Sequence, residues 1–185
     1  MAGRSAAVVS MEHSKDIAEL AGRGWMPRLL RGAGGVVPAM SPWATIHESA
    51  VLTGNIRILD DAVVGPRAVI RGDTAQIVVG PKAKIEQEAV LTASHNSFAD
   101  PVTGIPLQLV VGPSAQIGKG AVLDSCIVEG GAVIGERAVV GRGAIVEAGA
   151  KVGDDTVIPP GRRVPAKEEW KGNPATFVGL VGGDH

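Results

Sequence analysis

The chain has almost no aromatic side chains and almost no cysteine. Of its 185 residues three are Trp, two are Phe and none is Tyr, although 45% of the chain is hydrophobic. Val, Ile, Leu and Ala must therefore fill the core, which favours thin, tightly wound layers over a core packed with rings. The single cysteine, Cys126, excludes an internal disulfide framework and a cysteine-based zinc site.

Strong charge of one sign and long apolar runs are also lacking. The 18 basic and 19 acidic side chains leave a net charge of −1, so the chain has no electrostatic footprint for nucleic acid, and we expect no nucleic-acid partner. No apolar run approaches the roughly 18 residues of a membrane-spanning helix. The sequence therefore predicts a soluble or membrane-peripheral protein of one domain with a short extension.

A repeat of six residues occupies most of the chain. Val, Ile or Leu recurs at six-residue steps, with a nine-residue step after Ile70, a long step after Leu91 and a five-residue step after Leu123. Neither a helix, with a period of 3.6, nor a simple strand, with a period of 2, places residues in this way. The positions of this first column are Ile46, Leu52, Ile58, Val64, Ile70, Val79, Ile85, Leu91, Val111, Ile117, Leu123, Val128, Ile134, Val140, Val146, Val152, Ile158 and Val164.

A second column of small residues, mostly alanine as at Ala50 and Ala138, lies four residues after the first. One short strand and one turn fit six residues, and three such units close a triangular coil that stacks on the next. Eighteen repeat positions then make about six coils. We predict an all-β fold: a partly helical N-terminal extension over 1–43, a parallel β-helix over 44–166, and a C-terminal segment, 167–185, packed on the helix.

Two departures from the repeat mark possible functional regions. The nine-residue step holds Arg71-Gly72-Asp73, which predicts a bulge that projects from the coil. Twenty residues separate Leu91 from Val111 where six are expected, and this loop contains His95. Loops of this length on a solenoid usually cover a site or an interface.

With this repeat, the Arg71-Gly72-Asp73 bulge, the loop after Leu91 and the ending Trp170-Lys171-Gly172-Asn173-Pro174-Ala175, the chain resembles the γ-class carbonic anhydrases over about residues 44–180. It is most similar to the γ-carbonic-anhydrase-like subunits of mitochondrial respiratory complex I. The resemblance implies a left-handed β-helix and a trimer, in which a metal lies between subunits on three histidines. It also implies that Arg71 and Asp73 lie at the subunit interface.

Carried over position by position, the three metal ligands of that family fall on Thr92, Lys119 and Asp124, and none of them is histidine. Threonine is a poor zinc ligand, a lysine ammonium repels a dication, and one carboxylate does not hold a catalytic metal alone. Cys126 is interpreted as a small core residue. We therefore expect no bound metal, no cofactor and no catalytic residue. The remaining histidines do not restore a cluster: His13, His47, His95 and His185.

Three functional hypotheses follow. The first is a non-catalytic structural subunit in the membrane arm of complex I, on the matrix side of the mitochondrial inner membrane, in a heterotrimer with two other γ-carbonic-anhydrase-like chains. The second is a small left-handed-β-helix subunit of dynactin, since those subunits also keep an Arg-Gly-Asp bulge without a metal triad. The third is a hexapeptide acyltransferase, which would need His95 as general base and a slot between coils for a pantetheine arm.

Overall fold

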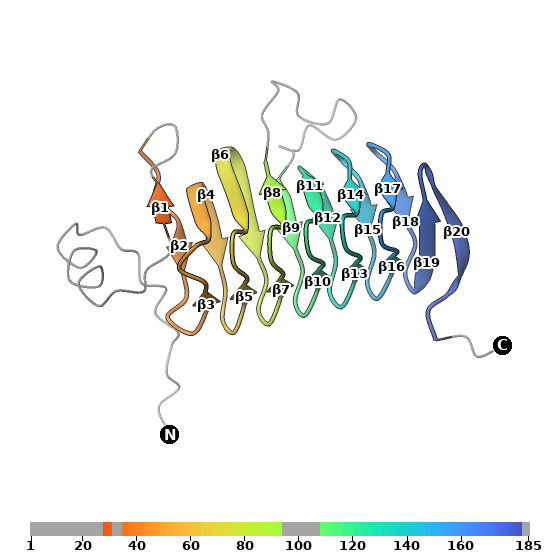
Figure 1. Ribbon diagram of the computed structural model, residues 1–185, viewed down its shortest axis with the longest axis horizontal. Helices are drawn as coiled ribbons and strands as arrows, with labels where there is room; N and C mark the ends of the chain where they lie inside the picture. The colour runs from red at the N-terminus through yellow and green to blue at the C-terminus, as the bar shows by residue number, and fades with distance from the viewer. Residues whose placement is uncertain (1–27, 31–34, 94–107, 183–185) are drawn as a thin grey trace.

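The structure, a computed structural model, describes residues 28–30, 35–93 and 108–182 (Figure 1). Every regular element in these residues is a β-strand, and the strands stack into a parallel solenoid of about six coils. The predicted all-β solenoid is therefore confirmed. The helix expected near Ser14 lies outside the described residues. Within them, no helix is long and apolar enough to cross a membrane.

Each coil contributes a strand to each of three faces, which we call the valine face, the second apolar face and the polar face. Two strands, β4 (Val51–Ile58) and β6 (Val69–Val79), run across a corner and belong to the first two faces at once. The valine face adds β1 (Arg28–Leu30), β8 (Val90–Thr92), β11 (Val122–Asp124), β14 (Val139–Val140) and β17 (Val157–Ile158). The second apolar face adds β2 (Ala39–Met40), β9 (Leu109–Val111), β12 (Ile127–Val128), β15 (Ile145–Val146) and β18 (Arg163–Val164). The polar face holds β3 (Thr45–Ile46), β5 (Val63–Val64), β7 (Lys84–Ile85), β10 (Gln116–Ile117), β13 (Val133–Ile134), β16 (Lys151–Val152), β19 (Glu168–Gly172) and β20 (Ala175–Leu180).

The first column of the repeat forms the interior of the solenoid. Seventeen of its eighteen members are at most 1% exposed, and only Ile46, in the first coil, is partly buried. Members from successive coils lie in register, as Ile117, Ile134 and Val152 do on the polar face. Because side chains alternate along a strand, the residue before each column member points outward. Each buried aliphatic side chain stabilises the fold by roughly 1.5–3 kcal/mol.

The small residues at the corners are required by the close stacking of coils. A Cβ on Gly135 would lie 2.6 Å from the backbone nitrogen of Asp154 in the next coil. Other turn positions need a positive φ, which is 68° at Gly149 and 54° at Arg137. Glycine reaches such angles without the steric cost that other residues carry.

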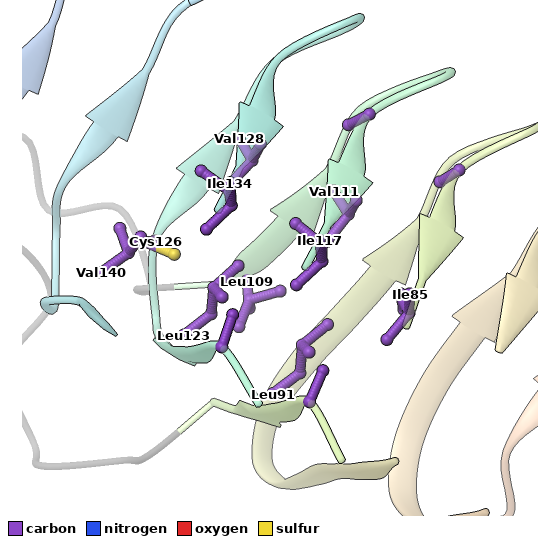
Figure 2. Packing of buried hydrophobic residues seen from close by; sticks show 14 of the residues in the cluster. Ile85, Leu91, Leu109, Val111, Ile117, Leu123, Cys126, Val128, Ile134 and Val140 are labelled. Carbon is purple, nitrogen blue, oxygen red and sulfur yellow. The ribbon is translucent and has the colours of Figure 1, made fainter. Parts of the chain in front are cut away.

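One corner has an interior that the repeat did not predict. Between the valine face and the second apolar face, the position two before each column member is Ile56, Ile77 or Leu109 in three successive coils, then Cys126 and Ala144. All five are at most 2% exposed, and Figure 2 labels Leu109 and Cys126 within the buried cluster. The side chains at this corner are therefore larger in the first three of these coils than in the last two.

The C-terminal end of the interior is closed by Trp170 rather than by another aliphatic residue. Trp170 lies in register with Val152 and is 7% exposed. The guanidinium of Arg162 lies 4.9 Å from the centre of its ring, a cation–π contact. After Trp170 the chain turns back, so β20 runs antiparallel to β19 and ends the stack (Figure 1).

Candidate functional site at one corner of the solenoid

Four polar residues lie one above another at the corner between the valine face and the second apolar face. Arg71 is in register with Thr92, and Thr92 with Asp124. Arg142 belongs to the next coil and reaches back to Asp124. We call Arg71, Thr92, Asp124 and Arg142 the corner row. Ala93 follows Thr92 in the chain, and residues 94–107 lie outside the described part.

The corner row brings hydroxyl, carboxylate and guanidinium groups together. Arg142 Nη2 lies 3.2 Å from Asp124 Oδ2, and Ser125 Oγ donates to Asp124 Oδ1 at 3.0 Å. Thr92 Oγ1 donates to the Leu123 carbonyl at 3.4 Å. In the bulge, Arg71 Nη2 donates to Asp73 Oδ2 at 3.0 Å, with the Arg71 side chain 60% exposed. The row therefore offers an anion-binding arginine beside groups that accept or donate a proton.

Apolar surface flanks this corner on both sides. On the valine face an unbroken ladder of outward-facing valines crosses six coils: Val51, Val69, Val90, Val122, Val139 and Val157. The second apolar face carries Val78, Val110, Ile127 and Ile145 in register. On the third face the outward ladder includes Lys84, Gln116, Lys151 and Glu169. The third ladder also holds Val63 and Val133, and the second also includes Arg57 and Arg163, so the valine face is the most uniformly apolar and the third face the most polar.

The structure separates the three positions expected to correspond to metal ligands. Thr92 and Asp124 lie side by side, whereas Lys119 lies in the turn before β11, at the other edge of the valine face. The guanidinium of Arg142 on Asp124 opposes a dication there, so these residues do not fit a catalytic metal. Among the described residues no group of three or more His, Cys, Asp or Glu could hold a metal ion.

The described histidine is not part of the corner row. His47 follows β3 in the first coil, and its Nδ1 lies 2.8 Å from Ser49 Oγ. Ser49 Oγ in turn accepts from the backbone nitrogen of Arg67 at 3.0 Å. This is a local turn interaction on an exposed surface. His13, His95 and His185 lie outside the described residues.

Cys126 is confirmed as a core residue by its burial. It is 0% exposed, and burial, with a smaller contribution from the charge of Asp124, raises the pKa of its thiol to about 12. Only about one part in ten thousand is then thiolate at pH 8. We predict that iodoacetamide does not label Cys126 in the folded protein and labels it fully in guanidinium chloride. Rapid labelling of the folded protein, followed by mass spectrometry, would contradict this.

The repeat, the three-faced solenoid and the corner row define a hexapeptide-repeat protein with a left-handed β-helix. The family model described as Dynactin subunit 5 matches residues 39–183. The chain therefore belongs to that family of hexapeptide-repeat proteins.

Curated relatives are bacterial. Carnitine operon protein CaiE of Proteus sp. (strain LE138) is 31% identical over 144 residues, which cover 78% of this chain and 68% of that protein. Protein YrdA of Escherichia coli (strain K12) is 28% identical over 119 residues, 64% of this chain. The chain spans 60% of the length of YrdA.

Solved structures share the whole architecture. A hexapeptide transferase family protein from Anaplasma phagocytophilum is 25% identical, with a TM-score of 0.74 and coverage of 83% of this chain and 84% of that one. A putative acetyltransferase from Bacillus cereus has a TM-score of 0.76 at 20% identity, with 84% of each chain covered, and shows the fold alone. The predicted left-handed β-helix is confirmed.

These comparisons correct the main functional expectation. The hypothesis of a non-catalytic subunit of mitochondrial complex I was wrong, since CaiE and YrdA are bacterial proteins and a structure that is 25% identical is described as a hexapeptide transferase family protein. The expectation that the chain is no enzyme was wrong for the same reason. The error lay in equating the loss of three metal ligands with the loss of all catalysis.

Proposed function

We propose that this chain is an acyltransferase of the hexapeptide class, which takes an acyl group from a coenzyme A thioester. The observation that carries the proposal is the corner row between two apolar faces, with Thr92 close in sequence to the 94–107 segment. An acyl-coenzyme A has a long thin arm and an anionic nucleotide end. The apolar ladders on either side of the corner suit the thin arm.

The proposed reaction needs a general base and no redox partner. A base removes the proton from an amine or hydroxyl acceptor, the freed electron pair attacks the thioester carbonyl, and the carbon–sulfur bond breaks. The thiolate then takes up the proton, which leaves free coenzyme A and an acylated acceptor. In the described corner row the carboxylate of Asp124 is paired with Arg142, so we do not assign the base to it.

His95 is the residue to which we assign the base, because it is the one histidine in the sequence between Thr92 and Val111. We predict that His95→Gln lowers acyl transfer from acetyl-coenzyme A by roughly 100-fold or more, the usual contribution of a general base. Coenzyme A affinity, measured by calorimetry, should stay within about twofold, since a base contributes little to ground-state binding.

His47→Gln is the matched control, because His47 contacts Ser49 in the first coil and not the corner row. We expect it to leave thiol release unchanged. A full-length protein that neither binds coenzyme A nor releases its thiol with a panel of amine and hydroxyl acceptors would contradict the proposal. Recovery of such a protein in a multi-chain complex would then favour the structural role suggested by the family description.

We further propose that the active unit is a three-chain assembly with the valine face and the second apolar face buried between chains. Both ladders run along the solenoid axis, so a threefold axis parallel to the solenoid brings ladder against ladder. The resemblance to γ-class carbonic anhydrases supports this arrangement, because it places a neighbour's Lys119 beside Thr92 and Asp124. Arg71 and Asp73 would lie at the same contact, where shielding strengthens their pair.

Val122→Glu tests this assembly. Val122 is 37% exposed in the middle of the valine ladder, and we predict that a carboxylate there raises the dissociation constant of the assembly by roughly 100-fold, because it is buried without a partner. Val63→Glu is the control, since Val63 is 38% exposed but lies on the polar face beside Lys84. Equal masses for both variants in sedimentation velocity would exclude the valine face as the contact.

Two sequence predictions stay open as proposals. One is that the other two chains of the assembly are related γ-carbonic-anhydrase-like proteins, which native mass spectrometry tests by counting copies of this chain. The other is the location on the matrix side of the mitochondrial inner membrane, which cell fractionation tests. Neither is needed for the acyl-transfer proposal.

A further inference from the structure

The polar face extends one strand further than the other two faces at the C-terminal end. The last strands of the valine and second apolar faces are β17 and β18, whereas the polar face continues through β19 to β20 (Figure 1). The inner side of β20 therefore has no facing strand among the residues that the structure describes. A sheet surface of this kind is normally buried against another element.

Large apolar side chains occupy that inner side. Phe177 is in register with Trp170 and Leu180 with Glu168, and a register shift between Glu169 and Trp170 gives β20 one extra residue between them. Because Glu168 and Trp170 are two residues apart, these four side chains lie on one side of the β19–β20 pair. Trp170 Nε1 donates to Glu168 Oε2 at 2.8 Å, which is consistent with that placement. Phe177 is 53% exposed and Leu180 63% exposed, although Trp170 beside them is buried. The interior of the solenoid thus continues onto an uncovered apolar surface.

We propose that this surface, formed by Phe177 and Leu180 beside Trp170, is a contact between two copies of this chain that meet end to end at their C-terminal coils. Residues 174–182 carry no charged side chain, and the one carboxylate among these four side chains, Glu168, accepts a hydrogen bond from Trp170 Nε1, so two identical surfaces meet there with little like-charge repulsion. A twofold axis across the solenoid end makes the contact closed and self-complementary. Each copy then covers the exposed Phe177 and Leu180 of the other.

The contact combines with the three-chain assembly without depending on it. A twofold axis perpendicular to a threefold axis joins two trimers into a closed hexamer. Three end-to-end contacts then form at the same time between the two trimers. One end alone offers few large side chains, against roughly 800 Å² per partner in a standard stable interface. We therefore expect the single contact to be weak and strongly dependent on protein concentration.

Phe177→Glu is the decisive variant, measured by sedimentation velocity of the full chain from about 1 μM to 1 mM. We expect the wild-type protein to reach twice the mass of its smaller assembly. The variant should stay at the smaller mass, because like charges then face each other across the axis. Since Phe177 is half exposed, the variant should fold, and Leu180→Glu should behave in the same way. Val63→Glu, on an inner strand of the same sheet, should associate like the wild-type protein.

Mixing Phe177→Glu with Phe177→Lys should restore the doubled mass, which a general surface effect would not do. Val122→Glu separates the two interfaces, because it removes the three-chain assembly and should leave end-to-end dimers of single chains. A wild-type mass that never doubles, or an unchanged mass in both Phe177→Glu and Leu180→Glu, would overturn the end-to-end contact. Neither result would bear on acyl transfer, which is measured separately.

Discussion

Ile134→Asp is expected to leave the chain unable to form the stacked β-helix. Ile134 is 1% exposed and lies in register between Ile117 and Val152, with hydrocarbon above and below it. A carboxylate in this position has no cation within the core, and an unpaired buried charge costs several kcal/mol. That is a large share of the roughly 5–15 kcal/mol that typically stabilises a domain of this kind. Circular dichroism and chemical denaturation of the purified variant measure the effect.

Val133→Asp provides the matched control, one residue away on the same strand. Val133 points outward and is partly exposed, with Gln116 and Lys151 as its neighbours in register. The new carboxylate remains in water and faces a lysine, so we expect a change of less than about 1 kcal/mol. If both variants denature at the same guanidinium concentration, the assignment of the two sides of β13 is wrong.

The interior of this fold was predictable from sequence because the stacking of coils allows only one side-chain orientation and one kind of side chain at each column position. A residue such as Val140 must point inward, be branched or long, and meet its equivalents in the coils above and below. Small residues such as Ala138 must occupy the corner, where the chain turns. Both requirements recur every six residues, so they appear in the sequence as a period.

The corner between the valine face and the second apolar face was not predictable in the same way. Ile77 and Leu109 occupy positions where the period expects alanine, and they pair in register across neighbouring coils. A sequence signal was present, since Ile56, Ile77 and Leu109 each lie two residues before a column member. Ile77 and Leu109 follow interruptions of the repeat, whereas Ile56 lies in a regular six-residue step, so the interruptions alone would not have identified this corner.

The candidate site was predicted in part. The resemblance to a metalloenzyme family directed attention to Thr92 and Asp124, and the structure places these two side by side. It did not identify Arg142, which belongs to a later coil and reaches Asp124 only because coils stack at this corner. The functional hypothesis failed because it considered only which metal ligands are missing from this corner. It did not consider what the hydroxyl, carboxylate and guanidinium groups present there can do.

Gly135→Ala is the second change for which we expect a large effect, because the added methyl group would meet backbone that cannot move aside. Its Cβ would lie 2.6 Å from the Gly153 carbonyl carbon and 2.5 Å from Asp154 Oδ1. That carboxylate accepts a hydrogen bond from the Glu136 backbone nitrogen at 2.8 Å, so it is held in place. Separating the two coils would also lengthen the bond from Gly135 nitrogen to the Val152 carbonyl. We expect a loss of about 3 kcal/mol in the free energy of unfolding.

Two other glycines separate the two possible causes of this loss of stability, which are backbone strain and steric contact with the next coil. Gly131 has a φ of +69°, and a Cβ added there would have no neighbour within 4 Å, so Gly131→Ala should cost only the backbone strain of about 1 kcal/mol. Gly179 has neither a positive φ nor a neighbour within 4 Å of such a Cβ, so Gly179→Ala should be nearly neutral. In urea denaturation, the free energy of unfolding should therefore be much lower for Gly135→Ala than for Gly131→Ala. For Gly179→Ala it should be close to that of the wild-type protein. If Gly131→Ala proves as costly as Gly135→Ala, backbone strain and not coil stacking limits what these corners accept.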